Sequence, residues 1–166
     1  TPSHSSEGMK QPDNRTARGK AGAFEESFPE IVNFIDKNYR TIKKKSGRAI
    51  AGLSMGGGHT LQISKEYPDM FDYVGLFSSS VRMSSNNAAS PVYENILEKL
   101  KVQFAKKPKL YWIAIGKDDF LYKANAEFRK VLDENGLKYE YFENGDGHIW
   151  RNWRIYLSMF APRLFK

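Results

Sequence analysis

Cysteine is absent from this 166-residue sequence, which excludes disulfide bonds, thiolate metal sites and a cysteine nucleophile. A long apolar run is absent as well, since no uncharged stretch approaches the ~20 residues that a transmembrane helix needs. Residues 1–22 contain almost no apolar side chains. This segment therefore shows no hydrophobic region of a signal peptide, and its composition predicts an irregular arm.

The remaining composition is that of one folded domain. The length suits a single domain, and 40% of the residues are hydrophobic, which is enough to build a core. The formal net charge of +7 raises the question of an anionic partner. Its lysines gather mainly at residues 43–45 and 106–109, just before expected strands, without a nucleic-acid recognition motif. We interpret them as solvated loop charge and expect neither a nucleic-acid nor a membrane partner.

From residue 23 onward, helical and strand patterns alternate along the chain. The strands are expected at about residues 48–51, 73–77, 109–115 and 138–143, and the helices at about residues 24–39, 59–67, 92–104, 123–135 and 150–160. This alternation predicts an α/β fold, in which a parallel sheet is covered by helices on both faces.

The segment Gly52-Leu53-Ser54-Met55-Gly56 has the pattern Gly-x-Ser-x-Gly between an expected strand and an expected helix. This is the arrangement of a nucleophile elbow, a sharp turn that presents a serine hydroxyl. We expect Gly52 and Gly56 to leave space where the chain approaches itself. The first N–H groups of the following helix would face an oxyanion. Ser54 is therefore the candidate nucleophile, and the alternative is a Gly/Ser-rich loop without chemistry.

Candidates for a base and an acid follow later strands. Asp118 and Asp119 follow the third expected strand, and His148 follows the fourth. The carboxyl ends of parallel strands meet at one edge of a sheet, so these residues are expected near Ser54. An imidazole can take the serine proton, and a carboxylate can orient the imidazole. We favour Asp119 as the acid and leave Asp118 as its neighbour or a helix cap.

The other histidines and the nearby aromatic residues have weaker signals. His4 and His59 are interpreted as ordinary surface residues. Phe120, Trp150 and Trp153 are candidates for the lining of an acyl or sugar pocket, although each could instead pack in the core.

Residues 52–58, 115–122 and 147–153 together resemble the putative esterase (esterase D-like) family of α/β-hydrolases, with a match over about residues 24–160. The resemblance is to the xylanase-associated feruloyl and acetyl esterases of carbohydrate esterase family 1. It implies a three-layer α/β-hydrolase and a serine carboxylesterase that cleaves feruloyl or acetyl esters of xylan, without a cofactor or metal.

By matching position, the resemblance makes Ser54 the nucleophile, Asp119 the acid and His148 the base. It also makes the backbone N–H of Met55 an oxyanion donor. The expected substrate is an ester-bearing polysaccharide or a small aryl or acyl ester, and the resemblance alone implies a secreted or periplasmic protein.

The sequence departs from this family in the number of strands. Family members carry further strands and a second oxyanion donor before this region, so residues 23–166 are expected to be the C-terminal part of a catalytic domain. About four strands would leave an exposed edge that favours self-association. A missing oxyanion donor typically lowers turnover about 10²–10³-fold. Two alternatives stay open: a non-catalytic fragment that binds carbohydrate or a partner, and a related esterase such as S-formylglutathione hydrolase.

Overall fold

The computed structural model describes residues 21–83 and 90–166, so the expected arm lies almost wholly outside the described residues. Four strands form one parallel sheet in the order β1-β2-β3-β4. They are β1 (Ala49–Leu53), β2 (Tyr73–Phe77), β3 (Leu110–Gly116) and β4 (Glu140–Asn144). The helices are α1 (Ala23–Asn38), α2 (Met55–Glu66), α3 (Ile96–Ala105), α4 (Tyr122–Glu134) and α5 (Trp150–Phe160).

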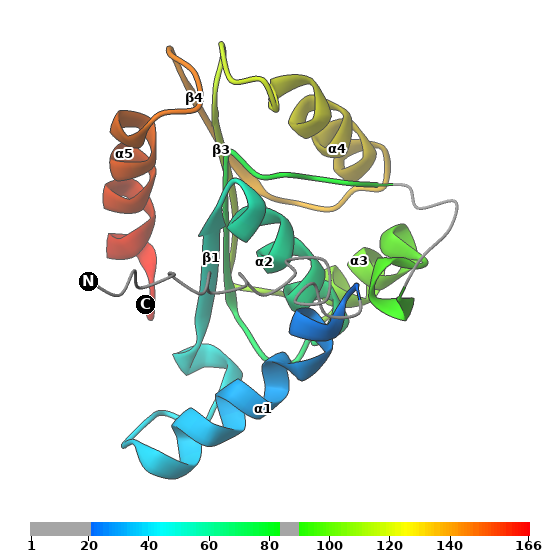
Figure 1. Ribbon diagram of the computed structural model, residues 1–166, viewed down its shortest axis with the longest axis vertical. Helices are drawn as coiled ribbons and strands as arrows, with labels where there is room; N and C mark the ends of the chain where they lie inside the picture. The colour runs from blue at the N-terminus through cyan, green and yellow to red at the C-terminus, as the bar shows by residue number, and fades with distance from the viewer. Residues whose placement is uncertain (1–20, 84–89) are drawn as a thin grey trace, which may run out of the picture.

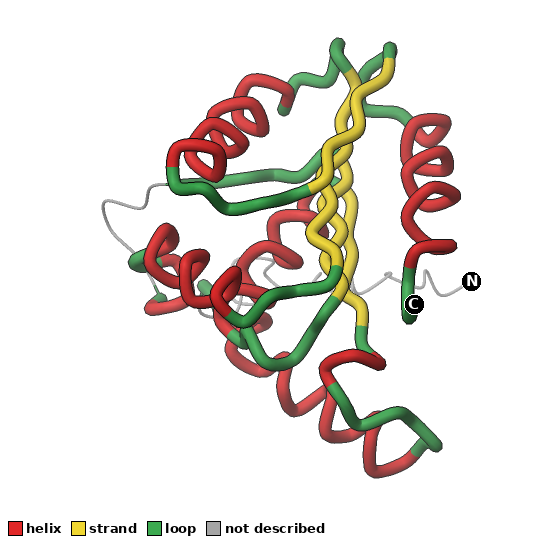
Figure 2. The backbone as a smooth tube through the Cα atoms, turned by 180° about the vertical axis from the view of Figure 1, so that it is seen from behind, coloured by secondary structure: helices red, strands yellow, loops and turns green. Residues whose placement is uncertain are grey.

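The sheet is the middle layer of three, which confirms the predicted α/β architecture. Helices α2, α3 and α4 cover one face, and α5 covers the other (Figures 1 and 2). The strands β2 and β3 are buried along their whole length, because they lie between the two helical layers. Trp112 of β3 packs with Tyr156 and Phe160 of α5, whereas Ile113 packs towards Leu61 and Phe128 on the opposite face.

The two edges of the sheet differ in charge. At one edge, β4 carries Glu140 and Glu143, which interact with Arg163 and Lys117. Charged side chains on an edge strand oppose pairing with another chain. At the other edge, β1 has the sequence AIAGL and no charged side chain. The edge of β1 therefore lacks the protection that β4 has.

Helix α1 keeps the apolar stripe that the sequence predicts, but much of this stripe is exposed. Phe24, Ile31, Ile35 and Tyr39 are each at least 40% exposed. The described part of the molecule thus leaves an apolar helix face in solvent, at the foot of the sheet below β1 (Figure 1).

One expected helix is wrong at its start. Residues 92–104 were expected to form a continuous helix, but the chain forms a short 3-10 helix over Pro91–Tyr93 and then a turn. Asn95 has a left-handed φ of 51°, so the α-helical hydrogen bonding of α3 begins only at Ile96. Asparagine tolerates this conformation better than most residues.

The two basic segments lie on loops before β1 and β3. Lys45 donates a hydrogen bond to the carbonyl of Lys106 and pairs with Asp72, while Lys106 pairs with Asp69. These loops precede the strands, so they lie at the amino ends of the strands, whereas Ser54 lies at the carboxyl ends. Among the described residues, none of the helices is both long enough and apolar enough to cross a bilayer.

Candidate active site

Ser54 lies at a sharp turn between β1 and α2, as the elbow pattern predicts. Its backbone has φ 54° and ψ −119°, a conformation that L-residues rarely adopt. The turn is held from both sides: the N–H of Ser54 donates to the carbonyl of Phe77 at 2.9 Å, and its carbonyl accepts from Ser80 N at 2.8 Å. Strain of this kind persists where the surrounding structure fixes it, and it is common at functional sites.

The close approach at this turn requires Gly52 but not Gly56. A Cβ atom on Gly52 would lie 2.2 Å from the carbonyl oxygen of Gly56, a backbone atom that cannot move away easily. A Cβ atom on Gly56 would meet nothing within 4 Å, so the expectation for that residue is wrong. Further tight contacts are at Gly57 and Gly58, where a Cβ atom would lie 2.8 Å from the side chain of Ser79 and 2.7 Å from the carbonyl oxygen of Ser80. The reason is that α2 packs directly on the loop after β2.

Asp119 and His148 form a hydrogen-bonded pair. Nδ1 of His148 lies 2.9 Å from Oδ2 of Asp119, and the exposed fractions of the two side chains are 17% and 0%. The other carboxylate oxygen of Asp119 accepts from the N–H of Leu121 at 2.9 Å. A carboxylate accepts the hydrogen bond from Nδ1–H, so in the neutral imidazole Nε2 is the acceptor. Asp118, the alternative acid, has an exposed side chain.

Ser54 lies at the carboxyl ends of the strands, as does this pair. Ser54 follows β1, Asp119 follows β3 and His148 follows β4, and all four strands are parallel. Met55 is the first residue of α2, so its N–H has no partner within the helix and lies where an anion is favoured. The carboxyl ends of the strands therefore carry a strained serine, a hydrogen-bonded imidazole and a helix N-terminus.

Aromatic rings surround the imidazole. The ring centroids of Phe120 and Trp153 lie 4.7 and 4.9 Å from that of His148, and Trp150 lies 5.1 Å from Trp153. Phe120 and Trp150 are 75% and 66% exposed, so both present large apolar surfaces beside the histidine. All three aromatic residues that the sequence singled out are therefore near His148.

An apolar pocket adjoins this region between β1 and α5. Its volume is about 240 Å³. The lining includes Leu53, which directly precedes Ser54, and both Trp150 and Trp153. In the described parts of the chain, no cluster of three or more histidine, aspartate or glutamate residues has the arrangement of a metal site.

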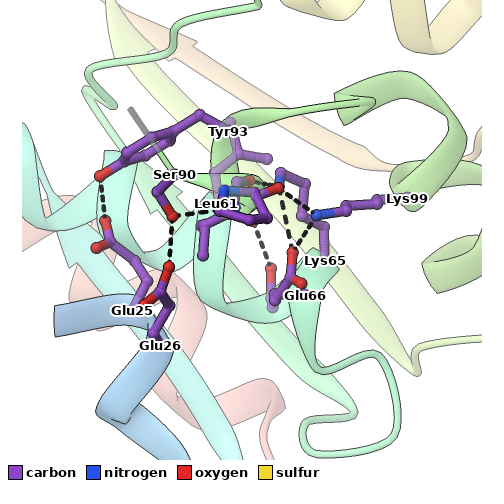
Figure 3. A network of polar contacts seen from close by, with 11 residues as sticks. Glu25, Glu26, Leu61, Lys65, Glu66, Ser90, Tyr93 and Lys99 are labelled. Atoms are coloured by element: carbon purple, nitrogen blue, oxygen red, sulfur yellow. Dashed lines mark hydrogen bonds and ion pairs between the residues drawn. The ribbon is translucent and has the colours of Figure 1, made fainter. Parts of the chain in front are cut away.

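A second histidine–carboxylate pair joins the elbow helix α2 to α1. Nδ1 of His59 is 2.7 Å from Oε1 of Glu25, and the hydroxyl of Tyr93 donates to the same oxygen at 3.1 Å. Figure 3 shows Glu25 and its neighbour Glu26 directed from α1 towards Tyr93 and Ser90. The side chain of Glu25 is only 3% exposed. His59 is therefore part of a polar network, contrary to its interpretation as an ordinary surface residue.

A chain of hydrogen-bonded polar side chains, which was not predicted from the sequence, adjoins the loop that carries His148. The hydroxyl of Tyr156 donates to Oδ1 of Asn144, and Nδ2 of Asn144 donates to Oδ1 of Asn152. Asn152 and Tyr156 lie one turn apart on α5, and both are fully buried. The only signal in the sequence is the four-residue spacing, which places Asn152 and Tyr156 on one face of the helix expected at residues 150–160.

The fold and the elbow define an α/β-hydrolase. A comparison with family models assigns residues 3–164 to the family described as putative esterase, and the chain belongs to this family. An endo-1,4-beta-xylanase/feruloyl esterase of Xylanibacter ruminicola is 31% identical over 138 residues, covering 82% of this chain and 17% of that protein. An acetyl esterase of Caldicellulosiruptor saccharolyticus is 26% identical over 156 residues, covering 78% of this chain and 58% of the relative.

The solved structures agree on the fold. A ferulic acid esterase of Anaeromyces mucronatus in complex with ferulic acid superposes with a TM-score of 0.72 at 21% sequence identity. The match covers 86% of this chain and 54% of that one. The chain thus spans less than two thirds of the length of each of these three proteins.

Proposed function

We propose that this chain carries the catalytic residues of a serine carboxylesterase that cleaves feruloyl or acetyl esters of a plant polysaccharide such as xylan. The observation that carries the proposal is the hydrogen bond between His148 and the fully buried carboxylate of Asp119, at the sheet edge where Ser54 forms a strained elbow. Family membership supports ester hydrolysis. The names of the two relatives, a feruloyl and an acetyl esterase, support the acyl groups.

The proposed reaction has two displacements. The hydroxyl oxygen of Ser54 attacks the ester carbonyl while Nε2 of His148 takes the hydroxyl proton. The carbonyl oxygen becomes an oxyanion, which the N–H of Met55 stabilises. When the oxyanion collapses, the sugar alkoxide leaves with the proton from Nε2, and an acyl-serine remains. Water then attacks the acyl-serine, and the same nitrogen carries the proton from water to Ser54.

The aromatic surroundings favour an aromatic acyl group over a small one. Phe120 and Trp150 expose apolar rings beside His148, and a feruloyl ring would stack on such a surface. An acetyl group would use little of it. We therefore propose a feruloyl ester as the preferred substrate, with the sugar directed towards solvent.

A fluorophosphonate probe tests the proposal, because it labels a serine only when a base activates it. We expect one label on Ser54, found by peptide mass mapping, and hydrolysis of methyl ferulate and nitrophenyl acetate. Ser54→Ala should abolish both, whereas Ser158→Ala, a change on the exposed surface of α5, should alter neither. Absence of label together with binding of xylan oligosaccharides would instead support a non-catalytic binding fragment.

We also propose that the edge of β1 mediates self-association with a second copy of the chain. The strand has no charged side chain, Ala51 on it is exposed, and an apolar pocket adjoins it. Light scattering should give a mass above that of a monomer, and Ala51→Glu should restore the monomer. A monomeric wild type would contradict this proposal. Secretion stays a prediction from family resemblance.

A further inference from the structure

The loops that carry Asp119 and His148 are joined to each other through their backbones. The N–H of Lys117 donates to the carbonyl of Asn144 at 2.9 Å, and the N–H of Asp118 donates to the carbonyl of Asp146 at 3.1 Å. The approach is so close that a Cβ atom on Gly116 would lie 2.1 Å from the same Asp146 oxygen. The relative position of acid and base therefore depends on how the loop of residues 144–147 is held.

Asn152 also holds this loop, and its Nδ2 lies beside Gly116, since a Cβ atom on Gly116 would lie 2.7 Å from it. Its side-chain Nδ2 donates to the carbonyl of Gly145 at 3.1 Å and to the carbonyl of Gly147 at 3.0 Å. Gly147 directly precedes His148, and Asn152 is fully buried. A buried amide with both N–H groups bonded to one loop fixes that loop more firmly than solvent-exposed contacts would.

The orientation of the Asn152 amide is determined from both ends. The two carbonyls of the loop accept only, so they must face Nδ2. At the other end, burial raises the pKa of Tyr156 well above its ordinary value, so its hydroxyl stays protonated and donates to Oδ1 of Asn144. Nδ2 of Asn144 then donates to Oδ1 of Asn152 at 2.7 Å. Every polar atom of the Asn152 side chain is thereby used in one orientation.

We propose that Asn152 is a positioning residue for His148, which acts through the loop backbone to keep Nδ1 of the imidazole against Asp119. It touches neither the substrate nor the imidazole. The inference rests on the proposed function, since it takes His148 as the base. Misplacement of a catalytic group by about 1 Å can lower the rate roughly 10²-fold, so loss of this clamp should affect turnover more than substrate binding.

The variant Asn152→Ala tests the inference, with Gln103→Ala as its control. Gln103 also has a buried side-chain amide, but it lies on α3, away from the loops that carry Asp119 and His148 (Figure 1). Both variants should lose comparable thermal stability. Tyr156→Phe is the milder second variant, because it removes one hydroxyl from the chain and keeps the ring.

Two readouts separate positioning from a general loss of structure. The first is the low-field proton NMR resonance of the Nδ1–H of His148, assigned by its absence in His148→Gln. The second is the split between kcat and KM for nitrophenyl acetate. In Asn152→Ala we expect the resonance to broaden or shift, and kcat to fall about 10–100-fold with KM within about twofold. Gln103→Ala should keep the resonance and most of kcat, and Tyr156→Phe should lie between the two alanine variants.

The inference is overturned if Asn152→Ala keeps the resonance and kcat, or if Gln103→Ala changes both to the same degree. Failure of the proposed function looks different: the wild type would show neither probe labelling nor hydrolysis, while the resonance would still report the position of the imidazole. An unchanged resonance in Asn152→Ala would then reject the positioning role independently of activity.

Discussion

The molecule contains two histidine–carboxylate pairs with nearly the same local geometry. His148 lies 2.9 Å from Asp119, and His59 lies 2.7 Å from Glu25. In both pairs Nδ1 of the imidazole faces the carboxylate. In both, the carboxylate is buried, with 0% and 3% exposure, and the imidazole is partly exposed, with 17% and 33%. Distance and burial therefore do not distinguish a catalytic pair from a structural one in this fold.

The surroundings of the two pairs differ. His148 belongs to a glycine-flanked loop at the carboxyl edge of the sheet, where Ser54 also lies, and its backbone is held by Asn152. His59 belongs to the middle of a helix, and Glu25 is shared with the hydroxyl of Tyr93. We propose that the first pair exchanges a proton with the substrate, whereas the second pair links α1 to α2 and to the segment after residue 90. The proposed roles of the two pairs therefore differ because only the first pair lies at the carboxyl ends of the strands.

Exchange of each histidine for glutamine gives the largest contrast. His148→Gln removes the proposed base, so kcat for nitrophenyl acetate should fall about 10³–10⁴-fold or more. His59→Gln, the matched change in the other pair, should leave kcat within about twofold, because it lies outside the proposed proton path. Steady-state kinetics on folded samples, checked by circular dichroism, provide the measurement. Equal losses in the two variants would remove the distinction between the pairs.

The carboxylates should show the opposite pattern in stability. Glu25→Gln weakens a buried hydrogen-bonded acceptor of two side chains, so it should lower the free energy of unfolding by about 1–3 kcal/mol with little loss of kcat. Asp119→Asn keeps the shape but disturbs the imidazole tautomer, so kcat should fall about 10⁴-fold. Urea unfolding and kinetics on the same samples test both. A Glu25→Gln variant with wild-type stability would contradict the structural role of the second pair.

Local patterns explain which features the sequence predicted correctly. The strand at residues 73–77 and the helix at residues 150–160 are confirmed to the residue, because a continuous apolar run and an amphipathic period are local signals. The elbow at Ser54 is equally local, since it needs only a strand, a turn and a helix in sequence. The sequence therefore predicted that Ser54, Asp119 and His148 lie at the carboxyl ends of the strands of one sheet.

Contacts between distant segments explain the errors. Glu25 was not singled out from the sequence, and its partner His59 lies 34 positions away. No periodic pattern relates these two residues. The same holds for Asn152, whose role depends on the loop that lies against its amide. Gly56 was misjudged because space around a glycine depends on what packs there, which a motif does not state.

The smallest expected effect concerns Lys65, which lies in the network around the second pair (Figure 3). Its side chain is fully buried and donates to the carbonyl of Val92. Burial lowers its pKa from 10.5 to about 8. Between pH 8 and 10.5 the unfolded chain therefore binds a proton that the folded chain lacks, so the folded state gains stability as the pH rises through this window.

Comparison with Lys65→Met isolates this contribution, because the variant lacks the titrating group and all others are shared. The wild type should gain roughly 1–3 kcal/mol relative to the variant between pH 8 and 10.5, measured by urea unfolding at several pH values. At fixed pH the two proteins should label equally with the fluorophosphonate probe, since this network does not contact Ser54. A stability difference that stays constant with pH would show that Lys65 titrates alike in both states. Unequal labelling would couple the second network to the elbow and end the separation between the two pairs.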